Sequence, residues 1–261
     1  MQFTDKDKTE CIYDESYICS PEPVVEVIKR KLSITTDDAE NAIYEAMDKL
    51  DCLNESCVVK KVLPIEDGDN VLTKYFKPAG PRNTTELLDN FNIDDVLEMW
   101  AKTKFPRFYH VYYQMIDFED YNGELAKVDI SKLIKKYDSL GVVMNTDVST
   151  GSGIHWFCLY CDLSAKPVTL EYFNSSGNPP RKQIQAWLIR TKQLLAEKKI
   201  ACDIIRVSNI EHQKDTETEC GPYSLYYIWS RLNGIPYKHF DQSRIKDKKM
   251  QEFRETLFRH N

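Results

Sequence analysis

The feature of this sequence that most constrains its fold is a proline two residues after a cysteine, at the start of a long hydrophobic run. Gly221-Pro222 opens a stretch that contains no helix breaker until Asn233-Gly234. Because proline is tolerated only in the first turn of a helix, the pattern predicts a helix over 220–232 with Cys220 at its amino end. Free backbone N–H groups and the positive end of the helix dipole favour a thiolate there, so we expect a reactive thiol with a lowered pKa.

Three polar residues upstream could complete an acyl-transfer site around Cys220. His155 lies early in a predicted strand, and an imidazole is the natural base for a thiol. Asn174 follows another predicted strand, where its side-chain oxygen could accept a hydrogen bond from the imidazole and fix the tautomer. The amide of Gln213 could join the Cys220 N–H in stabilising an oxyanion, and Gly221 would let a substrate backbone approach closely. Each residue alone has an ordinary explanation, but together they indicate cysteine-protease chemistry.

Other residues in the sequence offer two alternatives to this set. His212 and His239 are competing histidines that spacing alone does not exclude. Cys158 and Cys161, with His155 three residues upstream, resemble a metal-ligand pattern. A single Cys-x-x-Cys pair is not a structural zinc site, and strand alternation places Cys158 opposite the other two residues. We therefore expect these cysteines in a buried strand, no metal site and no cofactor.

Composition restricts the class of protein. The chain of 261 residues is 42% hydrophobic, which favours a folded domain with a substantial core. Its net charge of −6 argues against nucleic acid as the main partner. No apolar run reaches the ~20 residues needed to span a bilayer, and the charged amino terminus is no secretory signal. We therefore expect no membrane insertion, and the eight cysteines are predicted to be reduced thiols in a cytosol-like compartment.

The first 75 residues are predicted to form a helical amino-terminal arm. Apolar periodicity indicates helices over 23–32 and 36–50, and turn-rich segments at 66–70 and 77–83 indicate a connector. Residues 1–75 hold 9 basic and 17 acidic residues, a charge of 9 − 17 = −8, so residues 76–261 carry 26 − 24 = +2. A solvated helical face explains this acidity better than attraction of a basic partner.

Residues 76–261 are predicted to form a core that mixes strands with helices. Strands are expected over 108–116, 141–144, 154–161, 168–173 and 203–207, and helices over 92–100, 130–137, 180–198, 220–232 and 242–258. Strands interleaved with helices, and helices near both ends, indicate an α/β or α+β fold.

The residues around the predicted site carry a family resemblance. The order His155-Trp156, Asn174, Gln213 and Cys220-Gly221 resembles the clan of SUMO-specific and adenovirus proteases. Within that clan the chain is similar to the African swine fever virus type of polyprotein-processing protease. The most similar segments are 76–83, 90–94, 170–178 and 218–225, and the similarity fades before residue 76.

The resemblance implies an α+β, papain-like core with Cys220 as nucleophile, His155 as base, Asn174 as orienter and Gln213 in the oxyanion hole. It also implies cleavage after Gly-Gly in viral structural polyproteins during virion maturation, in the host cytoplasm and the virion. Trp156 would narrow the substrate groove. Gln213 lies one residue farther from Cys220 than in the African swine fever virus type, as in adenovirus-type enzymes.

Two other functions stay open at this point. The same chemistry could act on host SUMO or ubiquitin conjugates, because both substrate classes need a narrow Gly-Gly channel. A degenerate site could instead grip a Gly-Gly tail without cutting it. The sequence does not indicate the cleavage sites, an activating cofactor, the oligomeric state or the role of residues 1–75.

Overall fold

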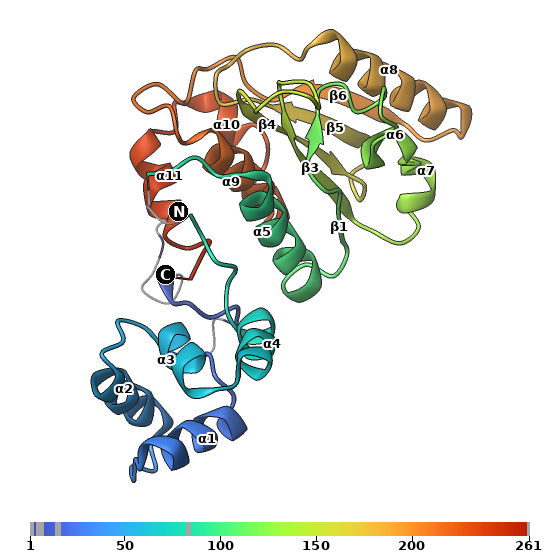
Figure 1. The fold of residues 1–261 in the computed structure, drawn as a ribbon. Helices are drawn as coiled ribbons and strands as arrows, with labels where there is room; N and C mark the ends of the chain where they lie inside the picture. Colours follow the sequence, from blue (N-terminus) through green and yellow to red (C-terminus); the bar gives the residue numbers. More distant parts are fainter. Residues whose placement is uncertain (1–2, 4–7, 14–16, 82–84, 260–261) are drawn as a thin grey trace. The chain divides into compact units, whose positions relative to one another are not determined.

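The chain folds into two compact units in a computed structural model that describes residues 3, 8–13, 17–81 and 85–259 (Figure 1). One unit comprises residues 1–84 with 252–261, and the other comprises residues 85–251. The predicted boundary at residue 75 coincides with the last residue of helix α4 (Ile65–Tyr75). The first unit continues to residue 84, nine residues beyond that boundary. Residues 82–84, which include part of the predicted connector, lie outside the described residues.

A mixed sheet is the centre of the second unit. Among the described residues its strands are β1 (Phe108–His110), β2 (Gln114–Met115), β3 (Ser139–Asn145), β4 (Trp156–Asp162), β5 (Val168–Phe173) and β6 (Cys202–Arg206). Their order is β1-β3-β4-β5-β6, with β2 also paired to β3. The β3–β4 and β4–β5 pairs are antiparallel, whereas β1–β3, β2–β3 and β5–β6 are parallel. Strands and helices in this mixture confirm the predicted α+β class.

Alternation along the strands gives the sheet two buried faces. Leu140, Phe157 and Leu170 pack with Trp187 and Leu188 of helix α8 (Lys182–Glu197) in one hydrophobic core. The other face is covered by α9 (Cys220–Leu232), which packs on β3 and β4 and against α5 (Asn90–Thr103). The short helices α6 (Glu124–Lys127), α7 (Ile130–Leu133), α10 (His239–Gln242) and a later helix, α11 (Asp247–Arg254), complete the series (Figure 1).

An ionic cluster fastens α9 to the middle of the sheet. Glu171 of β5 is fully buried and accepts hydrogen bonds from Tyr227 and from Nε and Nη2 of Arg231, at 2.8 and 3.0 Å for the two arginine contacts. The same guanidinium reaches Asp162 at 3.1 Å. A buried carboxylate is tolerated when its charge is paired and its lone pairs are used, as they are here.

Within residues 17–81, helices build the first unit. They are α1 (Glu22–Leu32), α2 (Ala39–Leu50), α3 (Glu55–Val62) and α4 (Ile65–Tyr75). The predicted helices over 23–32 and 36–50 correspond to α1 and α2, whose apolar faces meet Val58 of α3 in a common core. Asp38 and Asn54 cap α2 and α3 by accepting backbone N–H groups.

The predicted turn over 66–70 is wrong, because these residues lie inside α4. Glu66 and Asp67 sit in the first turn, where carboxylates stabilise the positive end of a helix. Gly68 is buried inside this helix, and a Cβ there would lie at an ordinary contact distance, 3.6 Å, from the carbonyl oxygen of Val59. Packing of Leu72 supplies the helix with tertiary support that local sequence does not reveal.

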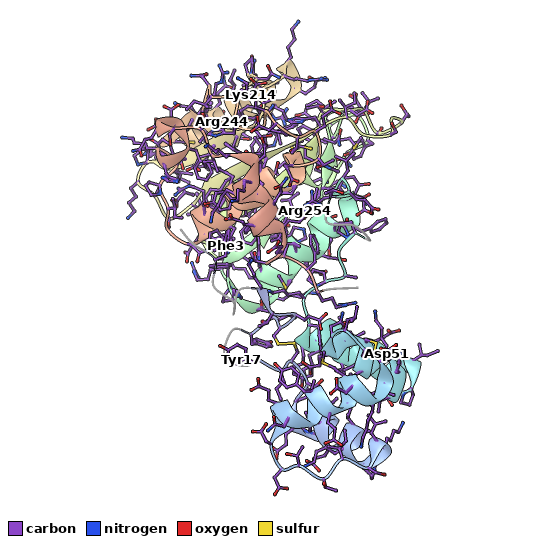
Figure 2. All side chains as sticks on the ribbon, turned by 90° about the vertical axis from the view of Figure 1, so that its left-hand side faces the viewer. Phe3, Tyr17, Asp51, Lys214, Arg244 and Arg254 are labelled. Atoms are coloured by element: carbon purple, nitrogen blue, oxygen red, sulfur yellow. A yellow bond between two sulfur atoms is a disulfide. The ribbon has the colours of Figure 1, made fainter. Side chains whose placement is uncertain are left out.

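The prediction that all cysteines are reduced is also contradicted. The first unit contains two disulfides, Cys11–Cys19 and Cys52–Cys57, drawn in yellow in Figure 2. The four free cysteines are buried, and they are Cys158, Cys161, Cys202 and Cys220. The spacing of the cysteines alone does not indicate these two pairings, which depend on the fold of the first unit.

Candidate active site

Cys220 is the first residue of α9, as the position of Pro222 predicted. Its side chain is buried, and burial raises the pKa of the thiol above its ordinary value. The backbone N–H groups of Trp156, Gly221 and Cys220 itself oppose that rise in the pKa. The predicted net lowering of the pKa is therefore wrong, because desolvation outweighs these N–H groups.

The predicted base and its predicted orienter are in contact. His155 directly precedes β4 and Asn174 directly follows β5, and these strands are antiparallel neighbours. Nε2 of His155 lies 2.7 Å from Oδ1 of Asn174. Burial lowers the pKa of His155, while the hydrogen bond to Asn174 opposes that shift.

Local hydrogen bonds fix which end of the Asn174 amide faces the imidazole. Oδ1 accepts the backbone N–H of Ser176 at 3.0 Å and its hydroxyl at 2.9 Å, and Nδ2 donates to the hydroxyl of Tyr172 at 3.0 Å. The oxygen can only accept, so Nε2 of His155 carries the proton and Nδ1 keeps its lone pair. The imidazole is thus held in the tautomer that can receive a proton at Nδ1.

A cleft of about 310 Å³ adjoins the thiol. Trp156 and Cys220 line it together with Leu88, Tyr113, Gly153 and Ile154 among other residues. The Trp156 indole donates from Nε1 to the carbonyl oxygen of Leu88 at 2.9 Å and meets Tyr113 edge to face. This hydrogen bond holds the ring in one orientation beside the thiol.

Gly221 lies against Leu88 at the start of α9. A Cβ at this position would lie 3.1 Å from the Cβ of Leu88, so the space beside the glycine is filled by a buried leucine. The absence of a side chain lets Leu88 pack on the start of α9, and the close approach of a substrate backbone to Gly221 stays a prediction. Leu88 was missed in the sequence, where it appears as one apolar residue before a predicted helix.

Gln213 lies in a loop beside the Asn174 turn. Its Oε1 accepts from the hydroxyl of Ser175 at 3.0 Å, and its Nε2 donates to the carbonyl oxygen of Thr216 at 3.1 Å. One amide hydrogen remains for a further acceptor. Arg244, labelled in Figure 2 beside Lys214, stabilises this loop by donating to the His212 carbonyl at 2.8 Å and pairing with Asp215. The oxyanion role of Gln213 stays a prediction.

The competing histidine at 212 is a structural residue. It is fully buried, and its Nδ1 accepts the backbone N–H of Ile245 at 3.1 Å while Nε2 lies 3.3 Å from the hydroxyl of Ser208. Burial lowers the pKa of His212 to about 4. A neutral imidazole with both nitrogens engaged has no free lone pair for a thiol proton.

The remaining candidates lie elsewhere. Cys161 belongs to the core on the α8 side of the sheet, and the alternation along β4 turns Cys158 to the opposite face. His239 is in α10, where its ring meets Phe240 edge to face. Tyr172 is the other residue that sequence reasoning missed, because it reads as an ordinary strand tyrosine two positions before Asn174.

Comparison with known proteins shows the family of the chain. Residues 81–261 match the C-terminal catalytic domain of the Ulp1 protease family. The chain is similar to the cysteine protease S273R of a Malawi tick isolate of African swine fever virus, at 36% identity over 94% of this chain and 98% of the relative. A relative from a Kenyan pig isolate of that virus, named SUMO-1 cysteine protease S273R, has the same identity and coverage. The crystal structure of the African swine fever virus pS273R protease superposes with a TM-score of 0.82 at 32% identity, covering 97% of each chain.

These features define a cysteine protease, a hydrolase of peptide bonds with a mixed α+β core. The chain belongs to the Ulp1 protease family and resembles the African swine fever virus S273R proteases over nearly its whole length, the first unit included. Among the described residues no helix is both long and apolar enough to span a membrane.

Proposed function

We propose that this protease cleaves after Gly-Gly in viral structural polyproteins during virion maturation, with Cys220 as nucleophile, His155 as general base and Asn174 as the residue that orients the base. The observation that carries the proposal is the 2.7 Å contact of His155 Nε2 with Asn174 Oδ1. The residue that follows His155 is Trp156, the first residue of β4, and its backbone N–H is directed at the Cys220 sulfur.

The chemistry follows from the fixed tautomer. Nδ1 of His155 takes the thiol proton as the substrate enters, so the thiolate forms next to the scissile carbonyl although its resting pKa is high. Sulfur attacks the carbonyl carbon, and the oxyanion meets the Cys220 N–H and the free amide hydrogen of Gln213. The imidazolium then protonates the leaving amine, and water hydrolyses the thioester. No hydrogen bond joins His155 to Cys220 within the described part of the chain, and such contacts often shorten only when substrate binds.

The indole of Trp156 supports the Gly-Gly specificity. It lines the cleft beside Cys220 and is held by Leu88, so it does not swing away without losing a hydrogen bond. A ring fixed over a narrow channel excludes a β-carbon at the two residues before the scissile bond. Only glycine satisfies that restriction at both positions.

Cleavage of peptides read by mass spectrometry tests the proposal. The wild-type protein should cut a Gly-Gly-Ala peptide after the second glycine and leave Gly-Ala-Ala and Ala-Gly-Ala peptides intact, and Cys220→Ala should cut none of them. Trp156→Ala, which opens the channel, should gain cleavage of a peptide with alanine next to the scissile bond. Equal cutting of all three peptides by the wild-type protein would reject the Gly-Gly assignment.

A second candidate substrate is a SUMO or ubiquitin conjugate, because one relative carries the name SUMO-1 cysteine protease. Both substrate classes present Gly-Gly, so a peptide does not separate them. A viral polyprotein fragment and a SUMO fusion, supplied at equal concentration, compete directly in one reaction. The proposal requires the polyprotein fragment to have the higher kcat/KM.

We further propose that the protease acts at viral assembly sites in the host cytoplasm and within the virion. Its substrates would be structural precursors, which are gathered at those places during assembly. Immunogold labelling of infected cells and purified particles tests this. Label confined to the secretory route would reject it.

A further inference from the structure

The first unit buries two carboxylates close to a pair of cysteines. Glu55, the first residue of α3, is 7% exposed and Glu10 is 8% exposed. Burial raises the pKa of Glu55, and the neighbouring charge of Glu10 raises it further. Among the described residues no cationic side chain pairs with either carboxylate, which is unusual for buried acids.

The three atoms that could bind a cation are held by different parts of the arm. The sulfur atoms of Cys11 and Cys19 and a carboxylate oxygen of Glu55 all lie within 4.8 Å of one another. The backbone of Cys11 pairs with that of Phe76 in an isolated antiparallel β-bridge. The backbone N–H of the following residue, Ile12, donates to the Tyr75 carbonyl at 3.1 Å. The backbone N–H of Cys19 donates to Glu55 Oε2 at 2.8 Å. The fold of the first unit thus brings two sulfurs and one carboxylate oxygen together.

We propose that the arm contains a thiol-gated Zn²⁺ site whose ligands are Cys11, Cys19 and Glu55. Two thiolates and a carboxylate are a ligand set that Zn²⁺ accepts, and water would complete four-coordination. The ion would supply the positive charge that the buried carboxylate lacks. Glu10 stays outside the ligand set, since its carboxylate accepts the backbone N–H and the hydroxyl of Ser56 at 3.1 and 3.0 Å.

The disulfide and the metal are alternative states of the same two sulfurs. Two molecules of a low-molecular-weight thiol such as glutathione together supply two electrons and two protons, break the Cys11–Cys19 bond and leave as one oxidised disulfide. Binding of Zn²⁺ then releases the two thiol protons, because the ligands are thiolates. The second disulfide, Cys52–Cys57, has no third ligand within the described residues and serves as an internal control.

Metal titration of the full chain tests the site. The protein carries Cys220→Ser so that the catalytic thiol binds no metal, and it is reduced with dithiothreitol and desalted anaerobically. Co²⁺ should give thiolate charge-transfer absorption at one equivalent per chain, Zn²⁺ should abolish that absorption, and elemental analysis should find one zinc per chain. The air-oxidised protein should bind none.

Three further variants assign the ligands. Cys19→Ser should remove the Co²⁺ absorption. Glu55→Gln keeps both cysteines and the side-chain shape, and it should weaken Zn²⁺ binding by at least about tenfold. Cys52→Ser should bind Zn²⁺ as the parent protein does. Absence of binding by the reduced protein overturns the proposal, as does binding that Cys19→Ser and Glu55→Gln leave unchanged. Circular dichroism identifies a variant that is unfolded, in which case Glu55→Gln decides.

Discussion

Oδ1 of Asn174 lies 2.7 Å from Nε2 of His155, and its orientation is set by Ser176 on one side and Tyr172 on the other. The amide is thereby prevented from turning its NH₂ group toward the ring, which would select the wrong tautomer. Orientation of the base thus depends on a turn, Asn174 to Gly177, whose closing hydrogen bond runs from the Gly177 N–H to the Asn174 carbonyl at 3.0 Å.

The first prediction concerns this orientation. Asn174→Ala should lower kcat/KM by on the order of 100-fold through misplacement of the imidazole. Tyr172→Phe removes one hydrogen bond to the amide, so it should cost about tenfold, mainly in kcat. Steady-state kinetics on a Gly-Gly-Ala peptide measure both. A larger loss in Tyr172→Phe than in Asn174→Ala would contradict the proposed order of action.

The second prediction concerns pH. His155 must be neutral to accept the thiol proton, and burial lowers its pKa below 6.5. A lowered pKa means that protonation begins only at more acidic pH, so the acid limb of the kcat/KM profile should have its midpoint below 6.5. The hydrogen bond to Asn174 opposes the shift, so Asn174→Ala should move the limb still lower. A midpoint above 6.5 would contradict the assignment of that limb to His155.

The third prediction concerns acid stability. The folded pKa of His212, about 4, is below its value of about 6.5 in an unfolded chain. The neutral buried imidazole contributes its full share to the free energy of unfolding above pH 6.5. That contribution is lost as the pH falls toward 4, which lowers the free energy of unfolding by about 3 kcal/mol. Urea unfolding at pH 7.5 and 4.5 measures it. His212→Asn should have a shallower pH dependence, and His239→Asn is the matched control.

The fourth prediction concerns the cluster that fastens α9 to the sheet. Glu171→Gln leaves the Arg231 charge without its main partner in a buried position, so the free energy of unfolding should fall by about 3–5 kcal/mol. The double variant Glu171→Gln with Arg231→Met removes both charges and should lose less than the sum of the single changes. Denaturant titration provides these values, and simple additivity would show that the two residues are not coupled.

The parts of the fold that sequence predicted are those with strong local signals. The strand over 168–173 and the helix over 220–232 have the predicted bounds, because alternation, Pro222 and Asn233-Gly234 define them. The strand over 108–116 is interrupted at 111–113, where the chain leaves β1 and pairs again as β2. Helix α3 was not predicted, since its eight residues depend on the Asn54 cap and on packing rather than on length.

Long-range relations explain what the sequence did not reveal. The Cys220 pKa depends on burial that only the assembled core creates, and the choice of His155 over His212 depends on hydrogen-bond partners tens of residues away. Cys19 and Glu55 are 36 positions apart, so no local motif could join them. The residue types in the candidate site were predictable, whereas their protonation states and supports were not.

The proposed nucleophile, base and orienting residue stand at the termini of elements whose interiors are packed in the core: His155 before β4, Asn174 after β5 and Cys220 at the start of α9. Amino-acid replacements inside these elements must preserve core packing, whereas the loops that end at these termini tolerate replacement far better. Lineages that keep the three termini can therefore exchange the loop over 146–154, and with it the rim of the cleft, without rebuilding the reaction. Substrate preference in such a protein can diverge faster than its chemistry.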